Sequence, residues 1–594
     1  MKNISRIFAV MTAVVAFASC DLTLLPEDKV TPDTYFKTRI DNERWTNRYY
    51  TLLVNPETSC RYSADDLVKK SMGSIIEGTR MASDAMSSNL EWGWKGLRWI
   101  NYHLEKIEQN CEDEAVKKEF KGVSYFFRAY FYFQKVMRFG DVPWYDSVLG
   151  SEDNESLTKP RDDRGFVVDK ILEDLDNAYA SLPSTKDPAR VNKWTALALK
   201  SRVALFEGTW RKYRGMPDAD KYLTAAAAAA KTFIEESGYT LYKEGDEPYR
   251  TLFVSEDINT VACEVVLGRM YEATTLKVAH SIQFNTVNDA QGFTRRFMYH
   301  YLMVTGERFT DQQGYETMEY KDEVQNRDPR LAQTVLCPGY IQIGATKPTP
   351  NPMVSLTGYQ PIKFVAQDAY SGASKGSHDV PVIRAAEIYL NYAEALAELG
   401  TLTQNDLDIS VNKLRDRVGM PKLDMAAANA DVDPFLEECY PNVTTGANKG
   451  VILEIRRERT IELVNEGYRQ WDMLRWKEGA QMVNTSESGK DMKYYGIYFP
   501  GPKFYDMDGD GQGDLHLYKK GETPEMGDGI TAKMIGVDIV LSEGDKGYVV
   551  AHSGINFRFD ETRDYLWPIP ADQRVLTNGN LTQNPGWTDS TNYN

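Results

Sequence analysis

Apolar residues recur every three to four positions through two long parts of the chain, which is the pattern of amphipathic helices. The clearest stretch runs from Glu114 to Phe139 and stops before Gly140 and Pro143. Its common face carries Phe120, Val123, Phe127, Tyr130 and Phe131. The spacing therefore predicts one long helix, which ends where glycine and proline follow because neither residue continues a helix well.

The same spacing predicts shorter helices before and after this one. They comprise an aromatic-rich helix from Thr31-Pro32 to Tyr50, and stretches at 97–107, 167–182, 193–210, 385–399, 406–418 and 451–476. Small residues at Ala196, Ala198 and Ala204, and the run from Ala225 to Ala230, let neighbouring helices approach closely. Such helical hairpins indicate a tetratricopeptide-like stack, although no clean repeat period is visible.

Two segments lack this periodicity. From about 263 to 379 the chain is rich in Gly, Thr, Asn, Pro and aromatic residues, and a second loop-rich segment runs from about 478 to 594. This composition is typical of short strands and long loops, and loops of this length usually carry function. We therefore predict a mainly α fold, in which a helical scaffold at about 30–262 and 380–477 carries loop-rich insertions and a few short strands that form the ligand face.

The first twenty residues have the layout of an export signal. Lys2 and Arg6 precede an apolar run from Ile7 to Ala18, which is too short to span a bilayer. Small residues directly before Cys20 resemble the lipobox of bacterial lipoproteins, in which the cysteine is lipidated and becomes the first mature residue. We expect residues 1–19 to be a signal peptide and Cys20 to carry a lipid anchor; the alternative is an ordinary signal peptide with a cysteine near its cleavage site.

Charge and cysteine content narrow the function classes. A formal net charge of −17 over 594 residues repels phosphate backbones, so nucleic acid is a poor partner. After Cys20 the cysteines are scattered and show no CxxC spacing: Cys60, Cys111, Cys263, Cys337 and Cys439. We expect free buried thiols, with one or two disulfides as the alternative, and no zinc site.

Several motifs, in order along the whole chain, resemble one protein family. They are FRAY at 127–130 with RFGDVP at 138–143, VNKWTALALKSR at 191–202, RAAEIYLNYAEA at 384–395, RRER at 456–459 with Glu462, Glu466, Arg469, Asp472 and Trp476, LWPIP at 566–570 and QNPGW at 583–587. The chain is similar to the SusD/RagB outer-membrane nutrient-binding lipoproteins of Bacteroidetes. The resemblance implies a loop-built binding face on a tetratricopeptide-type scaffold, and delivery of oligosaccharide to a SusC-like TonB-dependent barrel.

These motifs themselves are expected to be structural. Arg457, Glu458, Glu462, Arg469 and Asp472 place opposite charges near helical spacing, which suits ion-paired helix packing. Trp567, between Leu566 and Pro568, is expected to fill part of the core.

Sugar recognition needs an aromatic platform surrounded by groups that exchange hydrogen bonds with hydroxyls. The loop from Asp84 to Trp94 offers both, with Trp92 or Trp94 as the platform and Asp84, Asn89 or Glu91 as polar partners. In the similar family the binding face also draws on the segment between the two helical halves. The resemblance therefore implies a second group of candidates, which comprises Arg295, Arg296, Tyr299, Tyr301 and the loop from Lys363 to Asp379. For each aromatic residue the alternative is a place in the core.

An acidic loop indicates a structural calcium site. Asp506, Asp508 and Asp510 occupy positions 1, 3 and 5 of a calcium-loop pattern, Gln512 offers a carbonyl at position 7, and Asp514 stands at position 9. Position 12 is Leu517 in place of the usual glutamate, so a complete EF-hand is not expected. An acidic solvated turn is the alternative to calcium binding.

Enzyme motifs are missing from the sequence. The six histidines form no HExxH spacing, and neither a phosphate-binding glycine loop nor a G-x-S-x-G elbow occurs. A glycosidase would need only a pair of carboxylates assembled in space, so it stays as an alternative without positive support. No cofactor is expected apart from the calcium.

We therefore predict a non-enzymatic, outer-membrane, surface-exposed lipoprotein that binds an oligosaccharide or polysaccharide for uptake. Peptide capture is the first alternative, because some members of the similar family serve peptide uptake. A lipoprotein glycosidase and a purely structural assembly protein are the more distant alternatives.

Overall fold

The computed structural model describes residues 34–82, 92–444, 446–483, 493–525, 527 and 529–588. The expected signal peptide, Cys20, Asp84, Asn89 and Glu91 lie outside these residues. The predicted helix start at Thr31-Pro32 also lies outside them, and the first described helix begins at Arg39. There Thr38 and Asp41 form a capping box, because each side chain accepts a hydrogen bond from the backbone N–H of the other residue.

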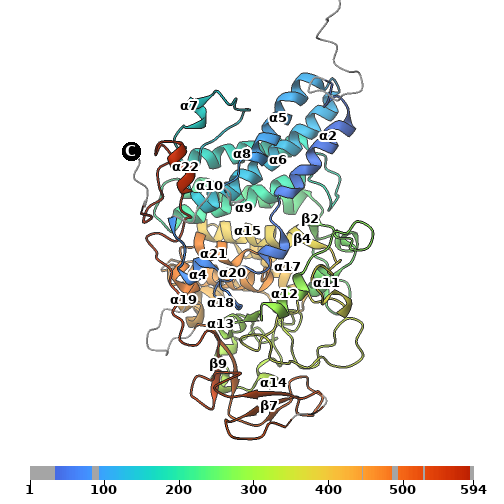
Figure 1. The fold of residues 1–594 in the computed structure, drawn as a ribbon, viewed down its shortest axis with the longest axis vertical. Coiled ribbons are helices and arrows are strands. Elements are labelled where there is room, and N and C mark those ends of the chain that lie inside the picture. The colour runs from blue at the N-terminus through green and yellow to red at the C-terminus, as the bar shows by residue number, and fades with distance from the viewer. Residues whose placement is uncertain are drawn as a thin grey trace, which may run out of the picture.

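Long helices packed in pairs form the N-terminal half of the fold, at the top of Figure 1. They are α2 (Arg39–Thr46), α5 (Lys95–Asn110), α6 (Glu114–Phe139), α8 (Arg164–Ser181), α9 (Lys193–Lys212) and α10 (Ala219–Glu236), with the short helices α3 (Pro56–Ser59), α4 (Ser74–Glu77) and α7 (Asn154–Leu157) between them. Helix α6 packs on α5 and α8, and α9 packs on α10. The long helix predicted at 114–139 is confirmed, and Gly140 ends it with a positive φ of 70°.

The helical scaffold continues after the first loop-rich segment. It comprises α15 (Ala385–Leu399), α16 (Gln404–Asp408), α17 (Val411–Arg417), α18 (Met425–Ala430), α19 (Pro434–Cys439), α20 (Lys449–Glu462) and α21 (Arg469–Arg475). Helix α15 packs on α10, α9 and α20, and so joins the two halves of the scaffold (Figure 1). The predicted mainly α fold of stacked helical hairpins is confirmed.

Two predicted helices are broken. The stretch 451–476 is interrupted between α20 and α21, where Asn465 and Gly467 adopt positive φ angles of 57° and 88° that a right-handed helix does not allow. The stretch 406–418 divides into α16 and α17 at Ser410, whose backbone is not helical. Both breaks fall within continuous apolar spacing, which is why the pattern alone did not show them.

Short strands and short helices connect and extend this scaffold, most of them in the middle and lower parts of Figure 1 and the last helix, near the C-terminus, at its upper left. They are β1 (Leu67–Val68), β2 (Val265–Arg269), β3 (Gly292–Phe293), β4 (Val380–Arg384), β5 (Tyr495–Phe499), β6 (Phe504–Tyr505), β7 (Leu515–Tyr518), β8 (Thr531–Met534) and β9 (Gly547–Val550), with α11 (Pro248–Val254), α12 (Ile282–Asn288), α13 (Arg295–Met298), α14 (Tyr320–Glu323) and α22 (Ala571–Leu576). Among them β5 pairs with β9 and β2 pairs with β4, both antiparallel, so segments distant in sequence meet.

The charged motif of α20 is buried inside the scaffold. The carboxylate of Glu462 accepts hydrogen bonds from Arg384 (2.6 Å), Arg417 (2.7 and 2.8 Å) and Arg330 (3.2 Å), and all four side chains are almost fully buried. The structural role expected for this motif agrees with these contacts. Trp567 stacks on Trp471 at 5.4 Å and packs against the main core. Among the described residues, no helix is both long and apolar enough to cross a bilayer.

Candidate ligand-binding site

A pocket of about 510 Å³ opens where α13, α19 and the β5–β9 pair meet, in the lower half of Figure 1. Five aromatic side chains line it: Tyr299, Tyr315, Phe435, Tyr495 and Tyr548. We call it the tyrosine pocket. Its remaining lining residues are Arg295, Arg296, Thr310, Asp311, Glu316, Asp433, Pro434, Glu438 and Lys493.

The aromatic rings of the tyrosine pocket contact one another. Tyr495 and Tyr548 stack with centroids 4.8 Å apart and planes at 27°, while Tyr299 meets Tyr315 and Phe435 edge-on at 5.4 and 5.8 Å. All five side chains are partly exposed, so they offer apolar surface to a ligand. Flat rings with polar hydroxyls are the surface that sugar recognition requires.

Arg295 contacts both groups of rings, the Tyr495–Tyr548 stack and the group around Tyr299. Its guanidinium lies 4.8 Å from the Tyr548 ring centroid, and its Nε donates to the Tyr299 hydroxyl at 2.6 Å. Nη1 donates to Glu323 and Tyr359, and Nη2 donates to the backbone of Tyr315. Burial raises the pKa of Tyr299 above its ordinary value, so this hydroxyl keeps its proton at neutral pH. The pocket floor is therefore held in place before any ligand binds.

The most exposed charges at the tyrosine pocket are negative. Arg295 and Arg296 are buried, and Arg296 donates to Cys439, to the Glu438 carbonyl and to Gln481. Lys493 is half-buried and donates to Gln481 at 3.1 Å. By contrast Asp311, Glu316 and Glu438 lie exposed at the rim, where the Glu438 carboxylate, 72% exposed, pairs with Arg296 at 3.8 Å. An anionic ligand would thus meet repulsion at the mouth.

The structure brings three predicted binding residues together in this pocket, namely Arg295, Arg296 and Tyr299. Tyr301 was a wrong prediction, because its side chain is fully buried and packs on Phe297 in the core. The loop from Lys363 to Asp379 does not line the pocket either. Lys363 is instead buried against Glu466, with Nζ to Oε1 at 2.6 Å.

Neither predicted tryptophan platform lies in the tyrosine pocket. Trp92 is only 2% exposed and packs edge-on against Phe139 at 4.8 Å, so the prediction of a stacking platform there was wrong. Trp94 is the N-cap residue of α5 and lines a different pocket with Tyr145 and Leu149. Asp84 and Glu91, their expected polar partners, lie outside the described residues.

Sequence reasoning missed most of the aromatic lining, which comprises Tyr315, Phe435, Tyr495 and Tyr548. Tyr495 and Tyr548 alternate with buried residues on their strands, because Gly496 and Val549 next to them are buried. This alternation along each strand was the signal that could have identified Tyr495 and Tyr548 as partly exposed. Only the pairing of β5 with β9 places the two tyrosines side by side, and no local pattern reveals that pairing.

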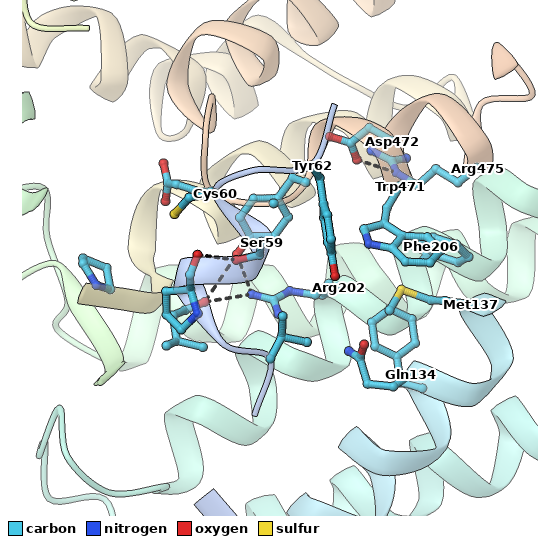
Figure 2. A pocket seen from close by; sticks show the side chains of 18 of the residues that line it. Ser59, Cys60, Tyr62, Gln134, Met137, Arg202, Phe206, Trp471, Asp472 and Arg475 are labelled. Atoms are coloured by element: carbon cyan, nitrogen blue, oxygen red, sulfur yellow. Dashed lines mark hydrogen bonds and ion pairs between the residues drawn. The ribbon is translucent and has the colours of Figure 1, made fainter. Parts of the chain in front are cut away.

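An interior cavity of about 100 Å³ lies between α6, α9 and α21 (Figure 2). Tyr62, Met137, Phe206 and Trp471 face it, and Arg202 lies on its wall. This arginine is paired with Glu387 at 2.6 Å. The volume suits a few waters, each of which occupies roughly 30 Å³ in the liquid, so the cavity is too small for an oligosaccharide.

The acidic loop connects β6 to β7, with strands and no helix at its flanks. Asp506, Asp508 and Asp514 each place a carboxylate oxygen within 4.8 Å of the others, whereas Asp510 and Gln512 are not part of this group. Burial and the two neighbouring carboxylates raise the pKa of Asp514 to about 6. Its Oδ1 is buried and has no hydrogen-bond partner among the described residues. Three of the five predicted ligands therefore converge.

Comparison with known proteins identifies the family. The family model described as "SusD family" matches residues 281–587, and a second, described as "Starch-binding associating with outer membrane", matches residues 35–205. The chain belongs to the SusD family. A SusD-like protein of Formosa agariphila, P38, is 20% identical over 81% of this chain and 93% of its own length.

Solved SusD-like structures share this fold. A SusD-like protein from Bacteroides fragilis aligns with a TM-score of 0.68 at 23% identity, covering 95% of this chain and all of the other. A structure described as being with xylogluco-oligosaccharide aligns with a TM-score of 0.57 at 16% identity, covering 94% of this chain and 98% of the other. The tetratricopeptide-like architecture is thus shared along nearly the whole chain.

Proposed function

We propose that this SusD-family protein captures a neutral oligosaccharide in the tyrosine pocket and delivers it to a SusC-like TonB-dependent transporter of the outer membrane. The observation that carries the proposal is the pocket itself, in which five partly exposed aromatic residues surround a preformed floor. Stacking against these rings would bind the apolar faces of sugar rings, and the rim side chains would bind hydroxyls.

The rim charges support a neutral ligand. Asp311, Glu316 and Glu438 are exposed and would repel uronic acids and sulfated sugars, while the basic residues of the pocket are buried or half-buried. Neutral glucans, xyloglucans and mannans therefore fit better than pectic or sulfated glycans. The same acidic rim also disfavours acidic peptides.

The decisive experiment is calorimetric titration of lipid-free protein, beginning at Asp21, with neutral oligosaccharides, acidic oligosaccharides and a peptide digest. We expect heat with one neutral class, lost in Tyr315→Ala and kept in Tyr370→Ala, a matched tyrosine outside the pocket. Binding of peptides alone would replace this proposal with peptide capture. Release of new reducing ends from the bound glycan would instead reveal a glycosidase.

Delivery also requires an anchor at the cell surface, which we assign to lipidated Cys20. In the native bacterium, Cys20→Ser should release the protein from the outer membrane and stop growth on the bound glycan, without changing the affinity measured in solution. Protease treatment of intact cells should remove the wild-type protein. Protection from the protease would contradict surface exposure.

We further propose that the acidic loop binds a calcium ion through Asp506, Asp508 and Asp514. The calcium-loop spacing and the convergence of these three carboxylates support it. The ion would be structural, because the loop joins β6 to β7 and the Asp508 carbonyl also accepts a hydrogen bond from Gly339. Calcium-dependent thermal stability tests this assignment.

A further inference from the structure

A second large pocket, of about 610 Å³, lies on the helical half of the molecule. Its walls are the first turn of α5, the segment 143–157 that contains α7, and α22 with Leu581. These helices stand at the top of Figure 1, far from α13 and β9, which carry the tyrosine pocket. We call it the Trp94 pocket. Its remaining lining residues are Trp92, Lys95, Leu97, Arg98, Asn101, Pro143, Tyr145, Ser147, Val148, Leu149, Gly150, Ser151, Leu157, Gln573 and Thr577.

Hydrogen bonds hold this pocket open. Asn101 Nδ2 donates to the carbonyls of Tyr145 and Ser147 at 3.0 and 3.1 Å, and Arg98 Nη1 donates to the Leu149 carbonyl at 2.7 Å. The Tyr145 hydroxyl donates to the Ser156 carbonyl at 3.0 Å. The first half of the loop is therefore fastened to α5, and Tyr145 ties its second half to the first, so a ligand would not have to order it.

The lining is mainly apolar. Leu97, Val148, Leu149, Leu157 and Leu581 contribute aliphatic surface, and Leu157 is 43% exposed at the mouth. Leucine and valine side chains around a recess of this size offer an apolar ligand a place to bind.

Glycan stacking does not suit this pocket. The Trp94 ring is surrounded by the rings of Trp92, Phe131, Tyr132 and Tyr145, all within 6.1 Å, so its faces are not free. Asn101 uses its amide nitrogen on the loop and its oxygen on Arg128. Few polar groups are thus left for sugar hydroxyls, whereas an apolar group would fill the space well.

Among the described residues, the charges that line the Trp94 pocket are positive. Lys95 and Arg98 lie exposed at its edge, no described aspartate or glutamate lines it, and neither cation forms an ion pair with another described residue. Two cations without an acidic partner would attract an anion. The tyrosine pocket differs, because its most exposed charges are acidic.

We propose that the Trp94 pocket binds an amphipathic organic carboxylate, with a planar aromatic body among the leucines and the carboxylate at Lys95 and Arg98. The apolar lining accounts for the aromatic body, and the two cations account for the carboxylate. The proposed site is independent of glycan binding in the tyrosine pocket. Free aromatic acids, whose carboxylate is not esterified, have this chemistry.

Titration with cinnamate, and with uncharged cinnamamide as its isostere, tests the proposal by calorimetry and tryptophan fluorescence. We expect cinnamate to bind, with an affinity that falls as salt rises because the contact is electrostatic. Lys95→Gln should weaken cinnamate binding about threefold and leave cinnamamide unaffected. Lys186→Gln, an exposed cation beside the Tyr239 ring, is the matched control and should change nothing.

Further variants distinguish the two pockets. Leu157→Trp should fill the mouth and abolish cinnamate binding, while Tyr315→Ala should leave it intact even where glycan binding is lost. Equal affinity for cinnamate and cinnamamide, no binding of cinnamate, or loss of binding in Tyr315→Ala would each overturn the assignment.

Discussion

Tyr495 and Tyr548 stack at 4.8 Å across the antiparallel β5–β9 pair, although 52 other residues separate them in the sequence. The Arg295 guanidinium also contacts this pair, 4.8 Å from the Tyr548 ring centroid. The pair thus forms a rigid aromatic wall that is fixed by main-chain pairing and by one buried cation. Rigid aromatic surface costs little conformational entropy when a ligand binds.

Tyr495→Ala should weaken glycan binding about tenfold, because loss of one stacking partner costs on the order of 1–2 kcal/mol. Tyr495→Phe keeps the ring and should retain most of the affinity. Calorimetry on both variants, with far-ultraviolet circular dichroism to confirm folding, makes the comparison. Equal affinity in Tyr495→Ala and wild type would remove this wall from the ligand site.

Glu438→Lys should relax the discrimination against acidic glycans, since it replaces an exposed carboxylate at the rim with a cation. Affinity for a uronic-acid oligosaccharide should rise relative to its neutral counterpart, and the gain should shrink at high salt. Glu112→Lys makes the same change of net charge at an exposed position outside the pocket and serves as control. An identical gain in both variants would indicate only a long-range effect of net charge.

Glu462→Gln should destabilise the protein by about 3–5 kcal/mol, because it removes the negative charge that three buried arginines share. Burial alone would raise the pKa of Glu462, but Arg417, Arg384 and Arg330 outweigh it and keep this pKa below its ordinary value. Urea denaturation measures the loss. The control, Asp169→Asn, breaks an exposed pair with Lys221 and should cost less than about 1 kcal/mol.

The helical scaffold could be predicted because its signals are local. Helix α6 follows from apolar spacing and from the glycine after Phe139, and the charge pattern around Glu462 already indicated ion-paired packing. The break before Arg469 was not predictable from spacing, because the apolar pattern continues across Asn465 and Gly467.

The candidate site was only partly predictable, because it depends on contacts between distant segments. Arg295 and Tyr299 were identified because the family resemblance places part of the binding face between the two helical halves, yet Tyr301, two residues further on, is fully buried in the core. A short helix such as α13 turns neighbouring side chains in opposite directions, and the sequence does not show which of them faces solvent. Tyr548, which lines the same pocket, lies 249 residues after Tyr299 in the sequence.

His378 should make the protein acid-sensitive. It is fully buried beside His280, with ring centroids 4.4 Å apart, and neither ring nitrogen has a hydrogen-bond partner among the described residues. Burial, with a smaller contribution from His280, lowers the pKa of His378 to about 3. The unfolded chain therefore takes up a proton below about pH 6.5 that the native state does not, and stability falls as pH falls toward 3.

The pH effect can be isolated by substitution. Between pH 6.5 and 5, His378 should cost the wild type about 1.6 kcal/mol of stability, and His378→Phe should remove this part of the pH dependence. Denaturation at both pH values gives the slopes, and equal slopes in wild type and His378→Phe would contradict the prediction.

Calcium should raise the melting temperature through the acidic loop, since an ion bound only by the native state stabilises it by about 2.7 kcal/mol at a hundredfold excess over Kd. Asp508→Asn and Asp514→Asn should abolish this rise, because each removes a carboxylate from the converging group. Asp510→Asn makes the same chemical change at a carboxylate outside that group, and this variant should keep most of the calcium-dependent rise in melting temperature. Magnesium should act weakly, since it prefers strict octahedral geometry and retains its waters. If all three variants responded to calcium like the wild type, the ion would bind elsewhere and the loop would be an acidic turn.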